Sequence, residues 1–155
     1  MGEALKNRIK QERFENPVQE AILNLLVAAG HVREKIERLC LDYEITHQQY
    51  NVLRILKGTH PEGYPRCEIA ARMIEKAPDV TRLIDRLEQQ GLVERARSEE
   101  DRRMSITRIS NRGIKLIERM QPRMEEVHAY FAERVSIRDR RELSRICEGL
   151  YGEEG

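Results

Sequence analysis

Charged side chains change sign abruptly in the segment SEEDRRMSITRISNRG, which covers residues 98–113. Three acidic residues run directly into Arg102 and Arg103, and an alternating run then leads to Ser110. The carboxylate of Asp101 could orient a neighbouring guanidinium through a charge-assisted, bidentate hydrogen bond. An arginine held in this way suits a narrow groove of strong negative potential, such as the minor groove of DNA. We therefore predict that this segment binds DNA.

A second set of polar residues recurs with helical spacing just upstream. Placed on a helical wheel, the apolar residues between 80 and 87 fall on one side, and polar residues fall on the other. The polar side offers arginine for guanine edges or phosphates, glutamine for adenine, and threonine for several bases. Asp85 lies three residues after Arg82, so we expect it to hold that guanidinium. The predicted DNA contacts of this helix are Pro78, Asp79, Thr81, Arg82, Arg86 and Gln89.

Two short helices followed directly by a β-hairpin would position both sets. Ile69, Ala70, Met73 and Ile74 mark the first helix, and Gly91 ends the second in the manner of a left-handed C-terminal cap. Residues 92–97 and 104–109 are rich in β-branched and aliphatic residues, which favours two strands. This order predicts a winged helix-turn-helix, in which the second helix enters a major groove and the hairpin reaches a minor groove. The predicted contacts of the hairpin are Arg97, Asp101, Arg102 and Arg103.

Long helices are predicted on both sides of this lobe. Asn16-Pro17 is typical of a helix start, and an apolar stripe with heptad-like spacing follows it as far as Leu39. The stripe fits an intramolecular core face or a dimer seam, and both uses remain open. Ser110 and Ser136 are expected to cap two further helices. We predict one domain over residues 1–155, with dimerisation helices at 16–41 and 111–150 and a DNA-binding lobe at 46–110.

Two segments of the chain lie outside the predicted helices and strands. Residues 1–15 are polar and charged, and we expect a partly ordered arm there. Residues 58–65, GTHPEGYP, are expected to form a loop.

The composition narrows the class of protein. Charged residues make up 35% of the chain and aromatic residues 5%, which favours a mainly α fold with a small β-hairpin wing. The net charge of +1 means that DNA contacts would come from local placement of arginines. The three cysteines lack metal-ligand spacing, and no apolar run approaches 18 residues. We expect a cytoplasmic protein with no membrane partner, no metal and no cofactor. Catalytic motifs are absent from the sequence, so we expect no enzyme.

The combined order of these motifs resembles the MarR-type (multiple antibiotic resistance regulator) transcription factors. Residues 78–95, PDVTRLIDRLEQQGLVER, resemble the recognition helix of that family, and residues 101–103 resemble its D-x-R wing. Residues 109–113, ISNRG, stand where the family has an L-T-x-x-G helix start, and residues 46–56 are similar to the helix that precedes the helix-turn-helix. The resemblance covers nearly the whole chain.

The resemblance implies roles for single residues. Arg82 matches a recognition-helix position that contacts DNA, Arg103 matches the wing arginine that enters the minor groove, and Asp101 matches its orienting partner. Asp79 stands where the family often has a small hydroxyl residue. Three roles are open to it: reading cytosine, capping the helix, or repelling phosphate.

The resemblance also implies a biological role. It implies a homodimer that binds a pseudo-palindromic, double-stranded DNA operator and represses transcription until a small phenolic or aromatic effector releases it. In the family this ligand sits between the dimerisation helices and the DNA-binding lobe. A winged-helix module that binds proteins, and a redox- or metal-responsive regulator, are the alternatives. Cys40, Cys67 and Cys147 are expected to be small buried or half-buried residues.

Overall fold

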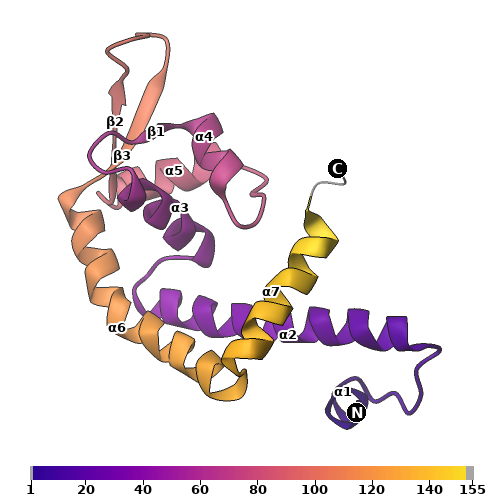
Figure 1. The fold of residues 1–155 in the computed structure, drawn as a ribbon. Helices are drawn as coiled ribbons and strands as arrows, with labels where there is room; N and C mark the ends of the chain where they lie inside the picture. The colour runs from indigo at the N-terminus through magenta and orange to yellow at the C-terminus, as the bar shows by residue number, and fades with distance from the viewer. Residues whose placement is uncertain (1, 153–155) are drawn as a thin grey trace. The chain divides into compact units, whose positions relative to one another are not determined.

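The computed structural model describes residues 2–152, and their contacts divide the chain into two compact units between His47 and Gln48 (Figure 1). The first unit contains α1 (Glu3–Ile9) and α2 (Pro17–Asp42). The second contains α3 (His47–Gly58, its first residue at the boundary), β1 (Tyr64–Pro65), α4 (Arg66–Arg72), α5 (Val80–Gln89), β2 (Val93–Arg97), β3 (Ser105–Ile109), α6 (Asn111–Arg134) and α7 (Ile137–Tyr151). The predicted fold class, mainly α with a small β-hairpin wing, is confirmed.

Side-chain caps begin α2, α5, α6 and α7. Asn16, Asp79, Ser110 and Ser136 each accept a hydrogen bond from the backbone nitrogen three residues later. Each bond satisfies a backbone donor that the first helical turn leaves without a partner. The helix starts predicted at Asn16, Ser110 and Ser136 are therefore confirmed.

The sheet is antiparallel, with strand order β1-β3-β2. Val93 pairs with Ile109 at the base of the β2–β3 hairpin, and Arg97 pairs with Ser105 near its tip. This hairpin is the wing, and it extends beyond the helices α3, α4 and α5 in Figure 1.

β1 was not predicted, because the segment 58–65 reads as a loop. The strand consists of Tyr64 and Pro65, which pair with Thr107 and Ile106 of β3. Beside it, Arg108 Nε donates to the carbonyl oxygen of Glu62 at 2.9 Å. Gly63 has a φ of 79° and lies so close to β3 that a Cβ would meet the carbonyl oxygen of Thr107 at 2.2 Å. A glycine is required there both by conformation and by space.

The core of the second unit draws on most of its elements. Side chains with at most 4% of their surface exposed come from the helices α3 to α6 and from both strands of the wing: Val52, Leu53, Leu56, Ile69, Ile84, Leu87, Val93, Ile109, Ile117 and Met120. In α5, Leu83, Ile84 and Leu87 are buried as the helical wheel predicted, and Val80 is half-buried. No described helix combines the length and apolar character that crossing a lipid bilayer requires.

Residues 1–15 contain the short helix α1, which buries Leu5, and this agrees with a partly ordered arm. One local prediction was wrong. The helix α4 ends at Arg72, so Ile74 lies outside it and is 77% exposed, while its backbone N–H donates to Asn51 Oδ1 at 2.9 Å. Here a contact with a residue far along the chain outweighs the local pattern.

The junction between the wing and α6 is closely packed. Ser110 Oγ donates to the carbonyl oxygen of Gly91 at 2.7 Å and accepts from the backbone nitrogen of Gly113 at 3.0 Å. A Cβ on Gly113 would meet the carbonyl oxygen of Leu92 at 2.3 Å and Ile109 Cγ1 at 2.7 Å. The first turn of α6 can therefore approach the wing only with glycine at this position.

We expect Gly113→Ala to lower the free energy of unfolding by about 1–3 kcal/mol, because backbone must move to admit the methyl group. Gly58→Ala is the matched control, since no atom lies within 4 Å of a Cβ built there. Thermal melting of both variants, followed by circular dichroism, checks this expectation. Equal melting temperatures for the two variants would contradict the close packing at the junction.

Candidate nucleic-acid interface

The six predicted contact residues of α5 and the turn before it are all exposed: Pro78, Asp79, Thr81, Arg82, Arg86 and Gln89. The opposite side of the helix is buried in the core. A helix so anchored presents one rigid polar face, which is the arrangement that reading a DNA groove requires.

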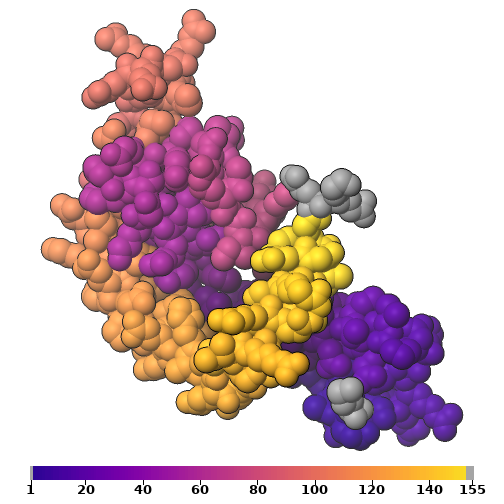
Figure 2. All heavy atoms as spheres, viewed as in Figure 1, coloured from indigo at the N-terminus to yellow at the C-terminus, as the bar shows by residue number. Residues whose placement is uncertain are grey.

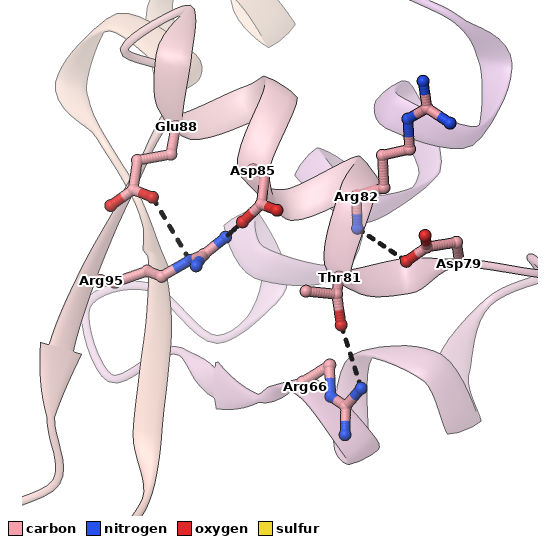
Figure 3. A network of polar contacts seen from close by, with 7 residues as sticks. All are labelled: Arg66, Asp79, Thr81, Arg82, Asp85, Glu88 and Arg95. Atoms are coloured by element: carbon pink, nitrogen blue, oxygen red, sulfur yellow. Dashed lines mark hydrogen bonds and ion pairs between the residues drawn. The ribbon is translucent and has the colours of Figure 1, made fainter.

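The start of α5 is fixed by Asp79. Its Oδ1 accepts a hydrogen bond from the backbone nitrogen of Arg82 at 2.9 Å (Figure 3). Of the three roles open to Asp79, capping is therefore the one it has in the structure. The bond uses the backbone of Arg82 and leaves its guanidinium out of the contact, and Figure 3 shows that side chain extending away from the helix.

The predicted pairing of Asp85 with Arg82 is wrong. Asp85 Oδ1 instead accepts from Arg95 Nη2 in β2, and Arg95 Nε lies 3.4 Å from Glu88 Oε2 (Figure 3). The side chain of Arg95 is 31% exposed, so it lies partly between the helix and the strand. Arg95 thus connects α5 to the wing through two carboxylates one turn apart.

Arg66, the first residue of α4, reaches across to α5. Its Nη1 donates to Thr81 Oγ1 at 3.0 Å, and both side chains are exposed (Figure 3). The two helices of the helix-turn-helix therefore meet through a polar contact on the same surface as the predicted DNA contacts.

The tip of the wing is held by local hydrogen bonds. Backbone bonds of 2.9 Å run from the nitrogen of Ser98 to the oxygen of Met104 and from the nitrogen of Met104 to the oxygen of Asp101. The carboxylate of Asp101 accepts from the backbone nitrogen of Arg103 at 2.9 Å. The predicted bond from Asp101 to an arginine guanidinium is therefore not the contact seen in the structure. Asp101 shapes the turn that carries Arg103.

The arginines of the wing lie on its surface. Arg97, Arg102 and Arg103 are exposed, and side chains at the tip stand clear of the remaining atoms in Figure 2. Arg97 lies on the same face of the sheet as Arg95, because the two are separated by one residue along β2. The wing consequently presents three exposed arginines, with Arg102 and Arg103 directly after the exposed acidic residues Glu99, Glu100 and Asp101 of its tip.

Sequence reasoning missed Arg66 and Arg95 as members of this surface. Their partners Thr81 and Asp85 are 15 and 10 residues away and belong to other elements. The periodicity of a single helix or strand cannot predict a contact between residues that are so far apart in the sequence. For Arg95, the available signal was two acidic residues one turn apart, Asp85 and Glu88, in the helix that precedes its strand.

The three cysteines differ in exposure. Cys40 is buried, Cys147 is half-buried and Cys67 is exposed, so the prediction of burial was wrong for Cys67. Burial, with a smaller contribution from Glu37, raises the pKa of the Cys40 thiol to about 11. The reactive thiolate is therefore scarce at neutral pH, which disfavours Cys40 as a redox sensor.

We expect iodoacetamide to alkylate Cys40 at least about 100-fold more slowly than Cys67 in the folded protein at pH 8. The folded state also binds the Cys40 thiol proton more tightly than the unfolded state does. Its contribution to stability is therefore complete below the unfolded pKa of about 8.5 and is lost as the pH rises through the folded pKa. Peptide mass spectrometry over a time course measures both rates. Rates within a few-fold of each other in the folded protein would contradict the burial of Cys40, and denaturant should equalise them.

Known proteins share both the sequence pattern and the fold. The family model described as the MarR family matches residues 45–105. The HTH-type transcriptional repressor IacR of Pseudomonas putida is 28% identical over 122 residues, which are 79% of this chain and 72% of IacR.

Two solved structures extend the comparison to nearly the whole chain. A MarR transcription factor from Planctomyces limnophilus is 36% identical, with a TM-score of 0.68 over 88% of this chain and 98% of that one. CouR from Rhodococcus jostii RHA1, solved with p-coumaroyl-CoA, shares the fold with a TM-score of 0.76, 20% identity, and coverage of 92% of this chain and 99% of CouR. The chain therefore belongs to the MarR family of transcription regulators.

Proposed function

We propose that the protein is a repressor that binds a pseudo-palindromic operator as a homodimer and is released by a small ligand. The observation that carries the DNA-binding part is the exposed polar face of α5 beside an exposed, arginine-bearing wing. In this proposal α5 lies in a major groove and the tip of the wing enters the adjacent minor groove. The repressor IacR supports the direction of regulation.

The two exposed arginines would have different tasks. Arg82 projects from the first turn of α5, where recognition helices contact base edges and phosphates. Arg103 projects from a turn that Asp101 shapes, so its guanidinium can enter a narrow groove without a competing bond to that carboxylate. Arg82 would discriminate between bases, and Arg103 would recognise the width and the negative potential of the minor groove.

Exposed apolar side chains near both ends of the chain support the homodimer. Val18, Ile22 and Leu26 of α2 are 66%, 53% and 63% exposed. Ile137 and Leu150 of α7 are 65% and 68% exposed. Apolar surface of this extent on long helices is typical of an interface, and a second copy of the chain would cover it by two-fold symmetry.

A small effector completes the proposal. The structure of CouR with p-coumaroyl-CoA supports a phenolic or other aromatic compound, because that protein has the same fold. A gel-shift assay with promoter fragments, repeated with a panel of aromatic acids, would identify the compound that releases the DNA.

We expect Arg103→Ala to weaken operator binding by about 1–3 kcal/mol, with the greatest loss at A·T-rich flanks. Arg82→Ala should cost a similar amount, concentrated at one base position per half-site if Arg82 reads a base edge. Asp101→Ala should cost less than Arg103→Ala, because it loosens the turn but keeps the positive charge. Fluorescence anisotropy with labelled operator variants measures all three.

Arg54→Ala is the control for these variants, since Arg54 is an exposed arginine on α3 outside the predicted DNA contacts. Melting temperatures should stay within a few degrees of wild type, because the altered side chains are exposed. Unchanged operator affinity in all three folded variants would refute the assignment of α5 and the wing to DNA.

The homodimer makes a separate prediction for α2. We expect Ile22→Lys to raise the dimer dissociation constant about tenfold or more, because it places a charge in an apolar interface. Asn24→Lys, an exposed polar position on the same helix, should leave the constant nearly unchanged. Sedimentation velocity over a concentration series measures both, and a wild-type protein that stays monomeric at micromolar concentration would contradict the proposal.

A further inference from the structure

We propose that Arg66 fixes the hydrogen-bonding direction of Thr81, so that the threonine acts as a donor to an acceptor edge of one base in the major groove. Arg66 would be a positioning residue for base recognition, although it belongs to α4 and lies outside the recognition helix. The inference rests on the proposed function, because it assigns a specificity role within the same DNA surface.

The contact between the two residues is well placed for this role. Arg66 Nη1 lies 3.0 Å from Thr81 Oγ1, both side chains are exposed, and Thr81 directly precedes the exposed Arg82 in the first turn of α5 (Figure 3). The backbone just before Arg66 is anchored, since Pro65 pairs with Ile106 of β3. Among residues 2–152, the Thr81 hydroxyl forms one hydrogen bond, and Arg66 is its donor.

The direction of this bond follows from the chemistry of the two groups. A guanidinium has donors and no acceptor, and it stays protonated in proteins. The bond to Arg66 must therefore use a lone pair of the Thr81 oxygen, which leaves its O–H proton available. A cationic donor on the oxygen also polarises that O–H group and strengthens it as a donor.

A donor of this kind discriminates between bases. In the major groove guanine offers N7 and O6, adenine offers N7, and thymine offers O4 as acceptors, whereas the amino group of cytosine is a donor. A free threonine hydroxyl can rotate to suit either kind of edge. Fixed by Arg66, Thr81 should prefer an acceptor edge and disfavour cytosine at one position in each half-site.

The rival explanation is that Arg66 contacts a phosphate directly. Such a contact would raise affinity for all operator sequences alike, because phosphates carry no sequence information. The two explanations therefore differ in discrimination between bases and can be separated by measuring it.

The test measures the affinities of all single-base operator variants for wild type, Thr81→Val, Thr81→Ser, Arg66→Ala and Arg66→Met. Thr81→Val removes the hydroxyl at nearly constant volume, and Arg66→Met keeps much of the aliphatic stem. We expect both Arg66 variants and Thr81→Val to lose about 3- to 10-fold of discrimination against cytosine at the same base position. Thr81→Ser should retain it. The double variant Arg66→Ala/Thr81→Val should discriminate no less than Thr81→Val alone.

The controls separate failure of this inference from failure of the proposed function. Arg54→Ala should leave the discrimination unchanged, and Arg103→Ala should weaken binding without altering preference at that base. A uniform loss of affinity in the Arg66 variants with intact discrimination would overturn the role of Arg66, as would unchanged binding. If wild type showed no operator preference and Arg103→Ala had no effect, the proposed function itself would fail.

Discussion

The position of the wing relative to α5 is the constraint on which the rest of the DNA surface depends. A helix in one groove and a hairpin in the next can act together only if the angle and distance between them are fixed. Gly91 turns the chain with a φ of 71°, and the backbone nitrogen of Leu92 donates to the carbonyl oxygen of Leu87 at 2.9 Å. Arg95 then joins β2 to Asp85 and Glu88 of α5. Ser110 and Gly113 secure the other end of the hairpin.

The distribution of charge follows from the same arrangement. Asp79 caps a helix, Asp85 and Glu88 hold Arg95, and Asp101 shapes a turn. These carboxylates are used for structure within the lobe. The guanidinium groups of Arg82 and Arg103 take no part in those contacts. A chain with a net charge of +1 can thus present local positive charge at the places where DNA contacts are proposed.

Local signals in the sequence predicted the elements well, and tertiary contacts escaped them. The caps at Asn16, Ser110 and Ser136 could be predicted because each bond spans only three residues. The two strands of the wing could be predicted from their β-branched residues and from Gly91. β1 could not, since it has two residues, one of them proline, and exists only by pairing with β3.

The same distinction holds within the candidate site. Exposure of the polar face of α5 follows from helical periodicity, so the four predicted residues in that helix, Thr81, Arg82, Arg86 and Gln89, were placed correctly on the surface. The partners of Asp85 and Asp101 were predicted wrongly, because proximity in sequence favoured Arg82 and a guanidinium. The fold offered each carboxylate a better-placed donor: Arg95 across the helix–strand contact for Asp85, and the backbone nitrogen of Arg103 for Asp101.

Methylation interference on the operator tests the central claim most directly. Dimethyl sulfate modifies guanine at N7 in the major groove and adenine at N3 in the minor groove, so one experiment reports on both grooves. If α5 and the wing bind adjacent grooves, methylated guanines should block binding within each half-site, and methylated adenines should block it in the neighbouring minor groove. Arg103→Ala should abolish the adenine interference alone. Specific binding with interference in only one groove, or adenine interference that persists in Arg103→Ala, would contradict this division between helix and wing.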